Sequence, residues 1–390
     1  MICKHIFERI YKRPPLAVAF TPYRICPLGA HVDHQLASIT GFAIDKGIHI
    51  AYGPKENGVV EISSVQFEGR AQWHVSSVTP SPAGDWADHL RGATLALGRK
   101  YPLRRGICAV ISGELPIGGL SSSAAVIITF LSALSKLNGI ELSEREMIEL
   151  ALEAENKYVG VSCGKLDQCC EVYCQKDKLL YMNLKTDEYE LIPAPENMKP
   201  HKIAIFFSGV ERSLAGSKYN ARVDEAKAAA YTLLAYSGAD YGKFADARLS
   251  DVSKDVFEKF GHLLPETFRK RATHFFTECE RVEKGVSAWR NGDIEDFGRL
   301  VFESGKSSIE QWETGSPELI ALYNIMCKVP GIYGGRFSGA GFKGCCMALI
   351  DPEREREIID TVTFEYLKTF PEYANKFSAH ICTTADGVKL

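Results

Sequence analysis

The segment Pro116-Ile117-Gly118-Gly119-Leu120-Ser121-Ser122-Ser123-Ala124-Ala125 joins an apolar, β-branched run at 107–111 to a strongly helical run at 124–137. Its two glycines allow backbone N–H groups to turn inward, because no Cβ stands in the way. Its three serines fall where the helix begins, at a helix end that carries partial positive charge. These features predict a phosphate-binding loop. The loop is not of the Walker A type, since the Gly-Lys-Ser/Thr ending is absent, and a Gly-Ser turn alone is equally compatible with no phosphate.

Two distant segments have a similar character. Residues 24–35 read Arg-Ile-Cys-Pro-Leu-Gly-Ala-His-Val-Asp-His-Gln, and residues 336–344 read Arg-Phe-Ser-Gly-Ala-Gly-Phe-Lys-Gly. Three motifs of this kind in this order resemble the GHMP kinases, the small-molecule kinases that include galactokinase, homoserine kinase and mevalonate kinase. The resemblance covers most of the chain. It implies a fold of two domains with the active site in the cleft between them.

Within this family the chain is most similar to the galactokinase branch. That branch has a segment of the type Arg-Val-Asn-Leu-Ile-Gly-Glu-His-Thr-Asp-Tyr, which residues 24–34 match at Arg, Gly, His and Asp. Residues 164–168 (Gly-Lys-Leu-Asp-Gln) resemble its Gly-x-x-Asp-Gln segment, and residues 219–222 (Tyr-Asn-x-Arg) resemble its sugar-contacting tyrosine segment. One departure is Ala30, which stands where that branch has Glu. The form Ala-His-x-Asp-His-Gln resembles the galacturonokinases, which phosphorylate a sugar acid.

The resemblance implies a role for each matched residue. Asp167 would assist loss of the anomeric proton, and Arg24 would stabilise charge on the transferring group. Sugar binding is implied for Ala30, His31, Asp33, Gly164 and Tyr219. ATP binding is implied for Pro116, Gly118, Gly119, Leu120, Ser121, Ser122, Ser123, Trp86, Gly339 and Gly341. Mg²⁺ would be held by Ser123 and Glu155.

Each of these roles has a purely structural alternative. Glu155 lies on the edge of the apolar face of its predicted helix, where a carboxylate can instead extend into solvent. Asp167 could cap the helix that follows it, and Arg24 could be an ordinary surface arginine. Trp86 could be a plain core residue, and Gly339-x-Gly341 could be a tight turn between strands.

The replacement of Glu by Ala30 has a physical meaning for substrate choice. In galactokinases the matching Glu contacts the C6 hydroxyl, and galacturonate carries a carboxylate there. Two carboxylates ~4 Å apart repel by ~1 kcal/mol in water and by ~4 kcal/mol at an effective dielectric near 20, and the larger figure is about a thousandfold in affinity. A uronate site must therefore lack this Glu. It also needs a donor for the carboxylate, and the sequence leaves four candidates open: Lys165, Arg212, Lys218 and Arg222.

Composition describes an ordinary globular enzyme. The 390 residues are 45% apolar and 24% charged with a net charge of −3, which gives no electrostatic attraction to nucleic acid or to an anionic membrane. The first residues lack the apolar region of a signal peptide, and no 18-residue apolar stretch occurs, so we expect a cytosolic protein. The twelve cysteines form no C-x-x-C pair, and we expect reduced, mainly buried thiols.

The pattern of elements predicts the α+β class. Ser143 and Glu146 form a capping box that opens a helix ending before Gly160. The stretch 193–200, with three prolines, is the expected boundary between an N-terminal domain (1–195) and a C-terminal domain (196–390). Strands are expected at 16–20, 47–52, 59–64, 107–112 and 203–208, on either side of the 339–344 loop and near 378–383; helices are expected at 86–100, 121–137, several places up to 327, and 353–369.

The sequence thus predicts an ATP- and Mg²⁺-dependent sugar 1-kinase that phosphorylates galacturonate. Galactokinase, or a kinase for another related sugar, is the alternative within the enzyme class. A non-catalytic sensor of sugar and ATP is the alternative outside it, and such a protein would be expected to have lost part of the Ser/Glu/Arg/Asp set that this chain retains. Small molecules are the expected partners, and the oligomeric state is left open.

Overall fold

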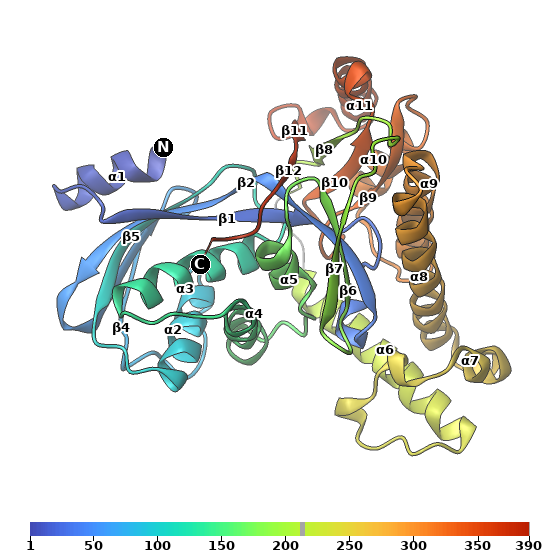
Figure 1. The fold of residues 1–390 in the computed structure, drawn as a ribbon, viewed down its shortest axis with the longest axis horizontal. Helices are drawn as coiled ribbons and strands as arrows, with labels where there is room; N and C mark the ends of the chain where they lie inside the picture. Colours follow the sequence, from blue (N-terminus) through green and yellow to red (C-terminus); the bar gives the residue numbers. More distant parts are fainter. Residues whose placement is uncertain (211–214, 390) are drawn as a thin grey trace.

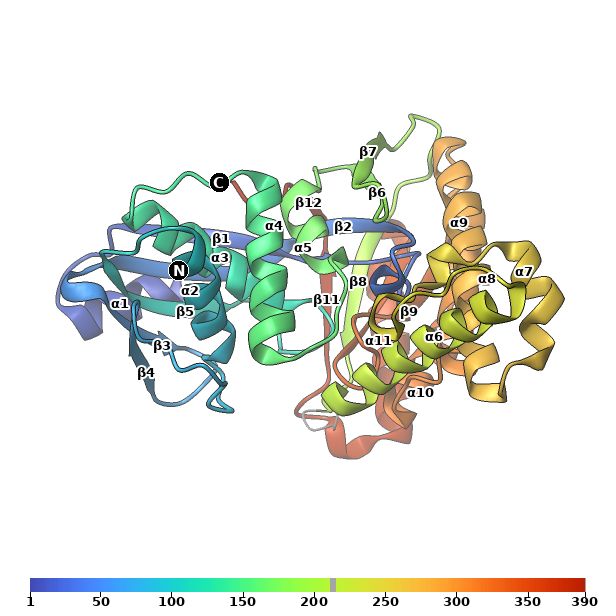
Figure 2. The same ribbon diagram turned by 90° about the horizontal axis from the view of Figure 1, so that it is seen from below.

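A computed structural model of the protein describes residues 1–210 and 215–389. The described residues form two lobes, each built on one sheet (Figures 1 and 2). The larger sheet contains eight strands in this part of the chain: β1 (Ala17–Ile25), β2 (Ser38–Lys55), β3 (Val59–Ser64), β4 (Arg70–His74), β5 (Gly106–Gly113), β6 (Lys178–Asn183), β7 (Glu188–Pro193) and β12 (Thr384–Ala385). The smaller sheet contains four: β8 (Lys202–Phe207), β9 (Ile332–Phe337), β10 (Cys345–Ile350) and β11 (Ser378–Cys382).

The helices cover these sheets and extend to one side of the second lobe (Figure 1). Those of the first lobe are α1 (Ile2–Tyr11), α2 (Asp88–Lys100), α3 (Ser122–Leu137), α4 (Glu144–Glu153) and α5 (Leu166–Tyr173). Those of the second are α6 (Ala215–Ser237), α7 (Lys254–Phe260), α8 (Glu266–Arg290), α9 (Ile294–Glu310), α10 (Pro317–Met326) and α11 (Glu355–Thr369). Short 3₁₀ turns include η1 (Asp33–Gln35), and Ala154–Val159 (η3) is a π-helix that follows α4 directly.

Strand β2 organises the larger sheet. Its 18 residues pair antiparallel with β1 and, further along, with β5, while its first residues, Ser38–Gly41, pair with β6. Helix α3 packs beneath β1, β2 and β5, and its buried positions are almost all Ala, Ile, Phe and Leu. A helix that is apolar on most sides belongs in a core. The phosphate-loop segment, which precedes α3, is therefore held at the end of a rigid element.

The predicted boundary near residue 195 is where the chain leaves one sheet for the other. Strand β7 ends at Pro193 and β8 begins at Lys202, yet the two lobes remain connected. Strand β12 returns from the C-terminal end of the chain to pair with Ala43 and Ile44 of β2. Ile205 and Phe207 of β8 belong to the same buried cluster as the first-lobe strands. The division into 1–195 and 196–390 stays a prediction.

Most predicted elements are present within a few residues of their expected ends. The capping box exists: the Glu146 N–H donates to Ser143 Oγ at 3.3 Å, and Glu146 Oε2 accepts from the Ser143 N–H at 3.1 Å. Five elements, α1, β4, β6, β7 and the two-residue β12, were not anticipated. Strands β4, β6 and β7 lie at or near a sheet end, and α1 is a short amphipathic helix. The sequence patterns of these elements are weak because only part of each element is buried.

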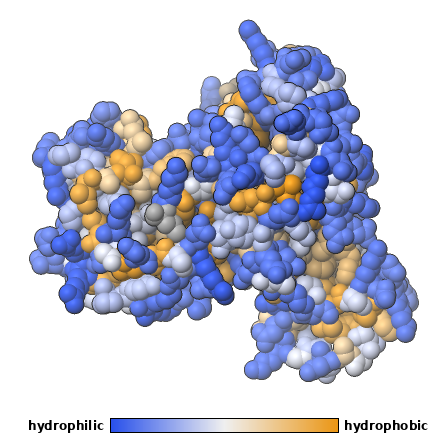
Figure 3. Space-filling model, in the orientation of Figure 1, coloured by the Kyte–Doolittle hydropathy of each residue, from blue (hydrophilic) through white to orange (hydrophobic). Residues whose placement is uncertain are grey.

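The cysteines and the surface agree with a globular enzyme. All twelve cysteines are free; Cys163 and Cys279 are half-buried, Cys327 is exposed and the others are buried. The face seen in Figure 3 is hydrophilic along most of its outline. Among the described residues, no helix is both long and apolar enough to span a bilayer.

Candidate active site

The phosphate-loop segment adopts a conformation that aims its polar groups toward one side. Gly118 and Gly119 have φ of +126° and +88°, and Ser121, the N-cap of α3, has a left-handed φ of +61°. The Ser121 hydroxyl is buried and has no hydrogen-bond partner among the described residues. A buried hydroxyl without a partner is costly, so an anion at this helix start would supply what is missing. Leu120 packs into the core, whereas Pro116 is exposed.

The glycine loop of the second lobe packs directly on this segment. A Cβ on Gly344 would lie 2.5 Å from the carbonyl carbon of Gly118, and a Cβ on Gly339 would lie 3.0 Å from the Cα of Gly119. Only glycine allows the two backbones to approach this closely. Gly341 faces Thr314 and the ring of Phe337 instead of the phosphate loop. The phosphate loop and the 336–344 glycine loop thus meet, as expected, although Gly344 rather than Gly341 makes the tightest contact.

Arg24 connects the phosphate loop to the Gly-x-x-Asp-Gln segment. Its Nε and Nη2 each lie 2.8 Å from Asp167 Oδ1, and its Nη1 donates to the Gly119 carbonyl at 3.0 Å. The Arg24 side chain is 4% exposed and that of Asp167 is 27% exposed. Asp167 lies in the first turn of α5 and is not its N-cap, which is Lys165. The carboxylate is therefore held by a buried cation while one side remains open to solvent.

The loop before Asp167 rests against the loop that contains Asp33. A Cβ on Gly164 would lie 2.5 Å from both the carbonyl carbon and Oδ2 of Asp33. Residue 164 must therefore be glycine for the loops at 24–35 and 164–168 to meet. Burial raises the pKa of Asp33 to about 6, and the charge of Asp167 acts in the same direction.

Glu155 is more deeply buried than its position on a regular helix predicts. It lies in the π-helical turn η3, which replaces the end of the predicted helix, and its exposure is 4%. Because a π-turn widens the helix, Glu155 rotates from the edge of the apolar face into the site. Its Oε2 accepts from Gln168 Nε2 at 2.5 Å. Burial raises the pKa of Glu155 to about 7, and the charge of Asp167 adds to the shift. A hydrogen bond with Ser123 acts in the opposite direction.

Four carboxyl groups therefore surround one arginine. Asp167 acts on the pKa of each of the others, which are Asp33, Glu155 and Glu171. Within the described part of the chain, no group of three His, Cys, Asp or Glu side chains could hold a metal ion. The Glu155 carboxylate and the Ser123 hydroxyl nevertheless fit Mg²⁺, which takes one or two protein oxygens together with phosphate oxygens of a nucleotide. A divalent cation at this position would also favour the ionised form of Glu155.

His31 and Tyr219 each contact a ring of the aromatic cluster beside the Asp33 loop. His31 has a left-handed φ of +63° and stacks on Trp312 at 5.4 Å between ring centroids, with planes 9° apart. Tyr219 on α6 meets the ring of His34 edge-on at 6.2 Å. The predicted sugar-binding residues thus lie within or beside the loop at 24–35. Trp312 and His34, which contact them, were not among the predicted site residues.

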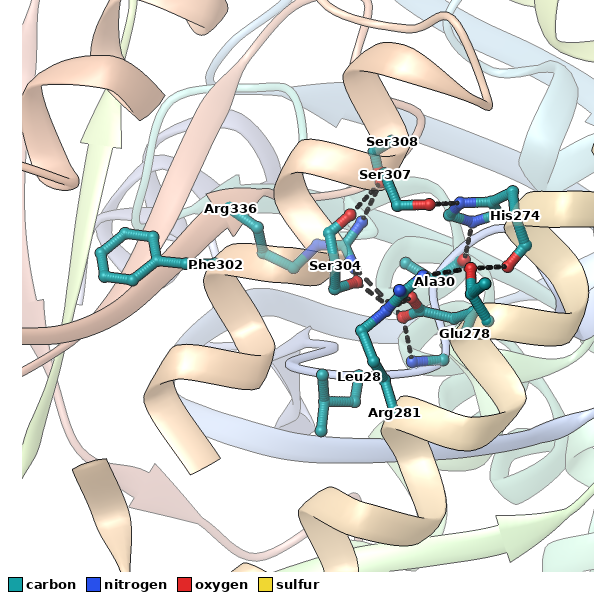
Figure 4. A network of polar contacts seen from close by, with 12 residues as sticks. Leu28, Ala30, His274, Glu278, Arg281, Phe302, Ser304, Ser307, Ser308 and Arg336 are labelled. Carbon is teal, nitrogen blue, oxygen red and sulfur yellow. Dashed lines mark hydrogen bonds and ion pairs between the residues drawn. The ribbon is translucent and has the colours of Figure 1, made fainter. Parts of the chain in front are cut away.

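A buried polar network fixes the backbone beside Ala30 (Figure 4). The Gly29 N–H donates to Glu278 Oε1 at 2.8 Å, and His274 Nε2 donates to the Ala30 carbonyl at 3.0 Å. Both partners lie on α8 of the second lobe. Glu278 also accepts from Arg281 Nε at 2.8 Å and from Ser304 Oγ at 2.6 Å, and Arg336 hydrogen-bonds Ser304. Residue 30 therefore sits on a backbone that has little freedom to move.

A separate cavity of about 160 Å³ lies beside the phosphate loop. Trp86 lines it and stacks on Phe67, with ring centroids 5.9 Å apart and planes 2° apart. Ser122 and Ser123 line the same cavity. An apolar slot with an aromatic wall next to a phosphate loop has the shape and chemistry of a nucleobase pocket. No pattern in the sequence marks Phe67 as a site residue.

The four basic residues that could bind a C6 carboxylate lie in different surroundings. Lys165 pairs with Asp187, and Arg222 pairs with Glu225 at 2.9 Å. Lys218 is exposed and lies 6.0 Å from the ring of Phe342. Arg212 lies outside the described residues. The sequence could have indicated Gln168, which stands next to Asp167, and Gly344, which ends the 336–344 motif, but no local signal marked Glu171 or Trp312.

Comparison with known proteins agrees with this geometry. The model of the GHMP kinase N-terminal domain matches residues 88–175, and that of the GHMP kinase C-terminal domain matches residues 286–368. A galacturonokinase from Arabidopsis thaliana is 40% identical, over 96% of this chain and 93% of the relative. A galactokinase from Roseiflexus sp. (strain RS-1) is 30% identical, over 98% of this chain and 95% of the relative.

Solved structures show the same fold. The structure of Lactococcus lactis galactokinase complexed with galactose superimposes with a TM-score of 0.89 at 26% identity, covering 99% of this chain and 98% of the other. Methanococcus jannaschii mevalonate kinase shares the fold at a TM-score of 0.65 and 16% identity, covering 94% of this chain and 98% of the other. The matched domains, the near full-length relatives and the shared fold together place this chain in the GHMP kinase family.

Proposed function

We propose that the protein transfers the γ-phosphoryl group of ATP to the anomeric hydroxyl of D-galacturonate, giving galacturonate 1-phosphate and ADP. The observation that carries the proposal is the position of Arg24, which contacts both Asp167 and the Gly119 carbonyl of the phosphate loop. The γ-phosphate held by the phosphate loop and the sugar hydroxyl that faces Asp167 would therefore meet beside Arg24. The 40% identical galacturonokinase supports the choice of substrate.

In this proposal Asp167 faces the anomeric hydroxyl and receives its proton as the oxygen attacks the γ-phosphorus. The bond from that phosphorus to the β,γ-bridging oxygen breaks, and ADP leaves with the electron pair. The anomeric hydroxyl is unusually acidic for an alcohol, so electrostatic assistance by a carboxylate can suffice. Arg24 offers positive charge to the transferring group, where the charge is spread over the phosphoryl oxygens.

The phosphates would lie against Gly118–Ser123 at the start of α3, and the base would lie in the cavity that Trp86 and Phe67 line. Ser123 and Glu155 would hold Mg²⁺, which supplies charge neutralisation on the phosphates when bound. Burial raises the pKa of Glu155 to about 7, so its carboxyl is only partly ionised near neutral pH. A cation at this position would return it to the ionised form.

The sugar would lie between Asp33 and the Ala30–His31 backbone, with Tyr219 on its other side. The small side chain of Ala30 supports a sugar acid, because it leaves no anion to oppose a carboxylate at C6. The principal alternative is galactose as the substrate, which the L. lactis galactokinase structure and the Roseiflexus galactokinase support.

An assay that couples ADP release to a chromogenic readout tests the proposal. Galacturonate, glucuronate, galactose and arabinose are compared at equal concentrations with MgATP. We expect the highest kcat/KM for galacturonate. A higher kcat/KM for galactose would replace the proposed substrate by the alternative, and binding of sugar and ATP with no ADP release would indicate a sensor.

A further inference from the structure

Three ring nitrogens beside the Ala30 loop have no hydrogen-bond partner among residues 1–210 and 215–389. They are Nε2 of His31, Nε2 of His34 and Nε1 of Trp312, and the three side chains are at least nine-tenths buried. Their rings are in contact: both histidines lie 5.4 Å from the ring centroid of Trp312. Buried polar atoms in native proteins nearly always have partners. Three unpaired nitrogens in one cluster therefore indicate a ligand that brings its own acceptors.

The hydrogen bonds around His34 show which of its nitrogens carries the proton. The backbone N–H of Leu249 donates to Gln35 Oε1 at 2.9 Å, which fixes the orientation of the amide. Gln35 Nε2 is then the donor that meets His34 Nδ1 at 2.9 Å. Since Nδ1 accepts, the neutral ring of His34 bears its hydrogen on Nε2. The unpaired nitrogen of His34 is therefore a donor.

The ring of His34 is neutral. Burial lowers its pKa to about 3; the nearby cations Arg248 and Lys227 and the ring of His274 act in the same direction, and the backbone carbonyl of His31 opposes them. Burial also lowers the pKa of His31 well below its usual value, and Arg336 adds to this effect. The cluster thus combines neutral N–H groups with a surrounding positive potential, which favours an anion.

Trp312 is held rigidly within the cluster. One face of its indole stacks on His31, and Arg271 Cζ lies 5.8 Å from its ring centroid. Arg271 is itself fully buried and is fixed by Glu225 at 2.6 Å and Glu313 at 2.7 Å. An indole Nε1–H can only donate. Its direction is set by these contacts, so this second donor is also prepared before a ligand binds.

The cluster adjoins Ala30, the residue at which the family resemblance places the C6 substituent. The ring of His274, which donates to the Ala30 carbonyl, is 5.6 Å from that of Trp312. His34 meets Tyr219, the predicted sugar contact, at 6.2 Å. His34 also stands where the galactokinase-type segment ends in Tyr, so two of the residues that depart from that segment, 30 and 34, belong to one site.

We propose that the N–H groups of His34 and Trp312 bind the C6 carboxylate of a uronic acid. This inference rests on the proposed function and names the residues that select its substrate. It assigns recognition to neutral donors in place of the four basic candidates, of which Lys165 and Arg222 already pair with acidic side chains. Hydrogen bonds to a carboxylate are stronger than those to a hydroxyl, so the same donors favour the acid over the neutral sugar.

The test measures kcat/KM for galacturonate and for galactose with His34→Leu and Trp312→Phe. Phe retains the stacking on His31 but removes the N–H. We expect the galacturonate-to-galactose ratio to fall by about tenfold to a hundredfold in each variant, the range for loss of a hydrogen bond to a charged group. His34→Gln, which keeps an N–H donor, should recover part of the ratio. His262→Leu, at an exposed histidine, is the control and should leave the ratio as in the wild type.

The outcomes separate this inference from the function on which it rests. If wild-type protein prefers galacturonate and the ratio is the same in both variants, the carboxylate is bound elsewhere and this inference is wrong. If both substrates lose kcat/KM equally, the cluster is structural and the inference is again wrong. A wild-type protein that phosphorylates galactose but not galacturonate overturns the proposed function itself. Thermal unfolding of each variant identifies any that fails to fold, and the other variant then decides.

Discussion

Arg24 and Asp167, which are 143 residues apart in sequence, form a partly buried ion pair: Arg24 Nε donates to Asp167 Oδ1 at 2.8 Å. The same guanidinium reaches the Gly119 carbonyl. One side chain thus sets the distance between the candidate proton acceptor and the candidate phosphate loop. Reactions that depend on orientation lose rate steeply when such a distance changes.

Asp167→Asn tests the role of this carboxylate. The amide still accepts a hydrogen bond from Arg24, so we expect the fold and nucleotide binding to persist. The kcat with galacturonate should fall by roughly 10²- to 10⁴-fold, the usual worth of a positioned acid–base group. Steady-state kinetics and nucleotide titration measure the two effects, with exposed Asp360→Asn as the control. A kcat close to that of the wild type would refute the assignment.

Glu155→Gln tests the metal site. The substitution removes the charge but keeps a hydrogen-bonding group near Ser123 and Gln168. We expect a higher Mg²⁺ concentration for half-maximal activity at saturating sugar and ATP, because a neutral amide is a poorer ligand for a hard cation. Glu149→Gln, on the exposed face of α4, should titrate like the wild type. An unchanged Mg²⁺ titration for Glu155→Gln would make this carboxylate structural.

Ala30→Glu tests how charge at this position affects substrate choice. A carboxylate here would repel one at C6 and would offer an acceptor to a C6 hydroxyl. We expect kcat/KM for galacturonate to fall by ~10- to 1,000-fold, corresponding to ~1.4–4 kcal/mol, and that for galactose to fall much less. Ala30→Gln, of similar size but without charge, separates repulsion from crowding. If Glu and Gln change the substrate ratio equally, charge at residue 30 does not select the sugar.

Glu171→Met tests a buried carboxyl that the proposed chemistry does not use. Glu171 is fully buried, and neither of its oxygens has a partner within the described chain. Removing an unpaired buried polar group should raise the free energy of unfolding by ~1–3 kcal/mol at pH 7. Exposed Glu149→Met is the control.

The pH dependence of this effect has a definite sign. Burial raises the pKa of Glu171 well above its usual 4.5, and the charge of Asp167 adds to the shift. Because the pKa of Glu171 is higher in the folded than in the unfolded protein, Glu171 costs the wild type least stability below the unfolded pKa. The free energy of unfolding of the wild type falls as the pH rises above that value. The advantage of Glu171→Met should therefore grow from pH 4.5 toward neutral pH in urea unfolding. A pH-independent advantage would show that Glu171 does not titrate differently on folding.

The sequence by itself determined the family and the local chemistry. The Pro116–Ala125 segment, residues 24–35 and residues 336–344 each carry their glycines and polar residues within one short stretch, and a loop-to-helix junction is a local structure. Such patterns can be read because backbone conformation and helix ends depend on neighbouring residues. The capping box of Ser143 and Glu146 could be predicted for the same reason.

Only the tertiary structure decided how these pieces meet. The contact of Gly344 with Gly118, the π-turn that buries Glu155 and the stacking of Trp312 on His31 depend on packing between segments far apart in the chain. The proton position on His34 depends on Leu249, which is 214 residues from Gln35. Burial, ion pairing and pKa shifts arise from the whole three-dimensional surroundings of a group, so no local pattern in the sequence specifies them.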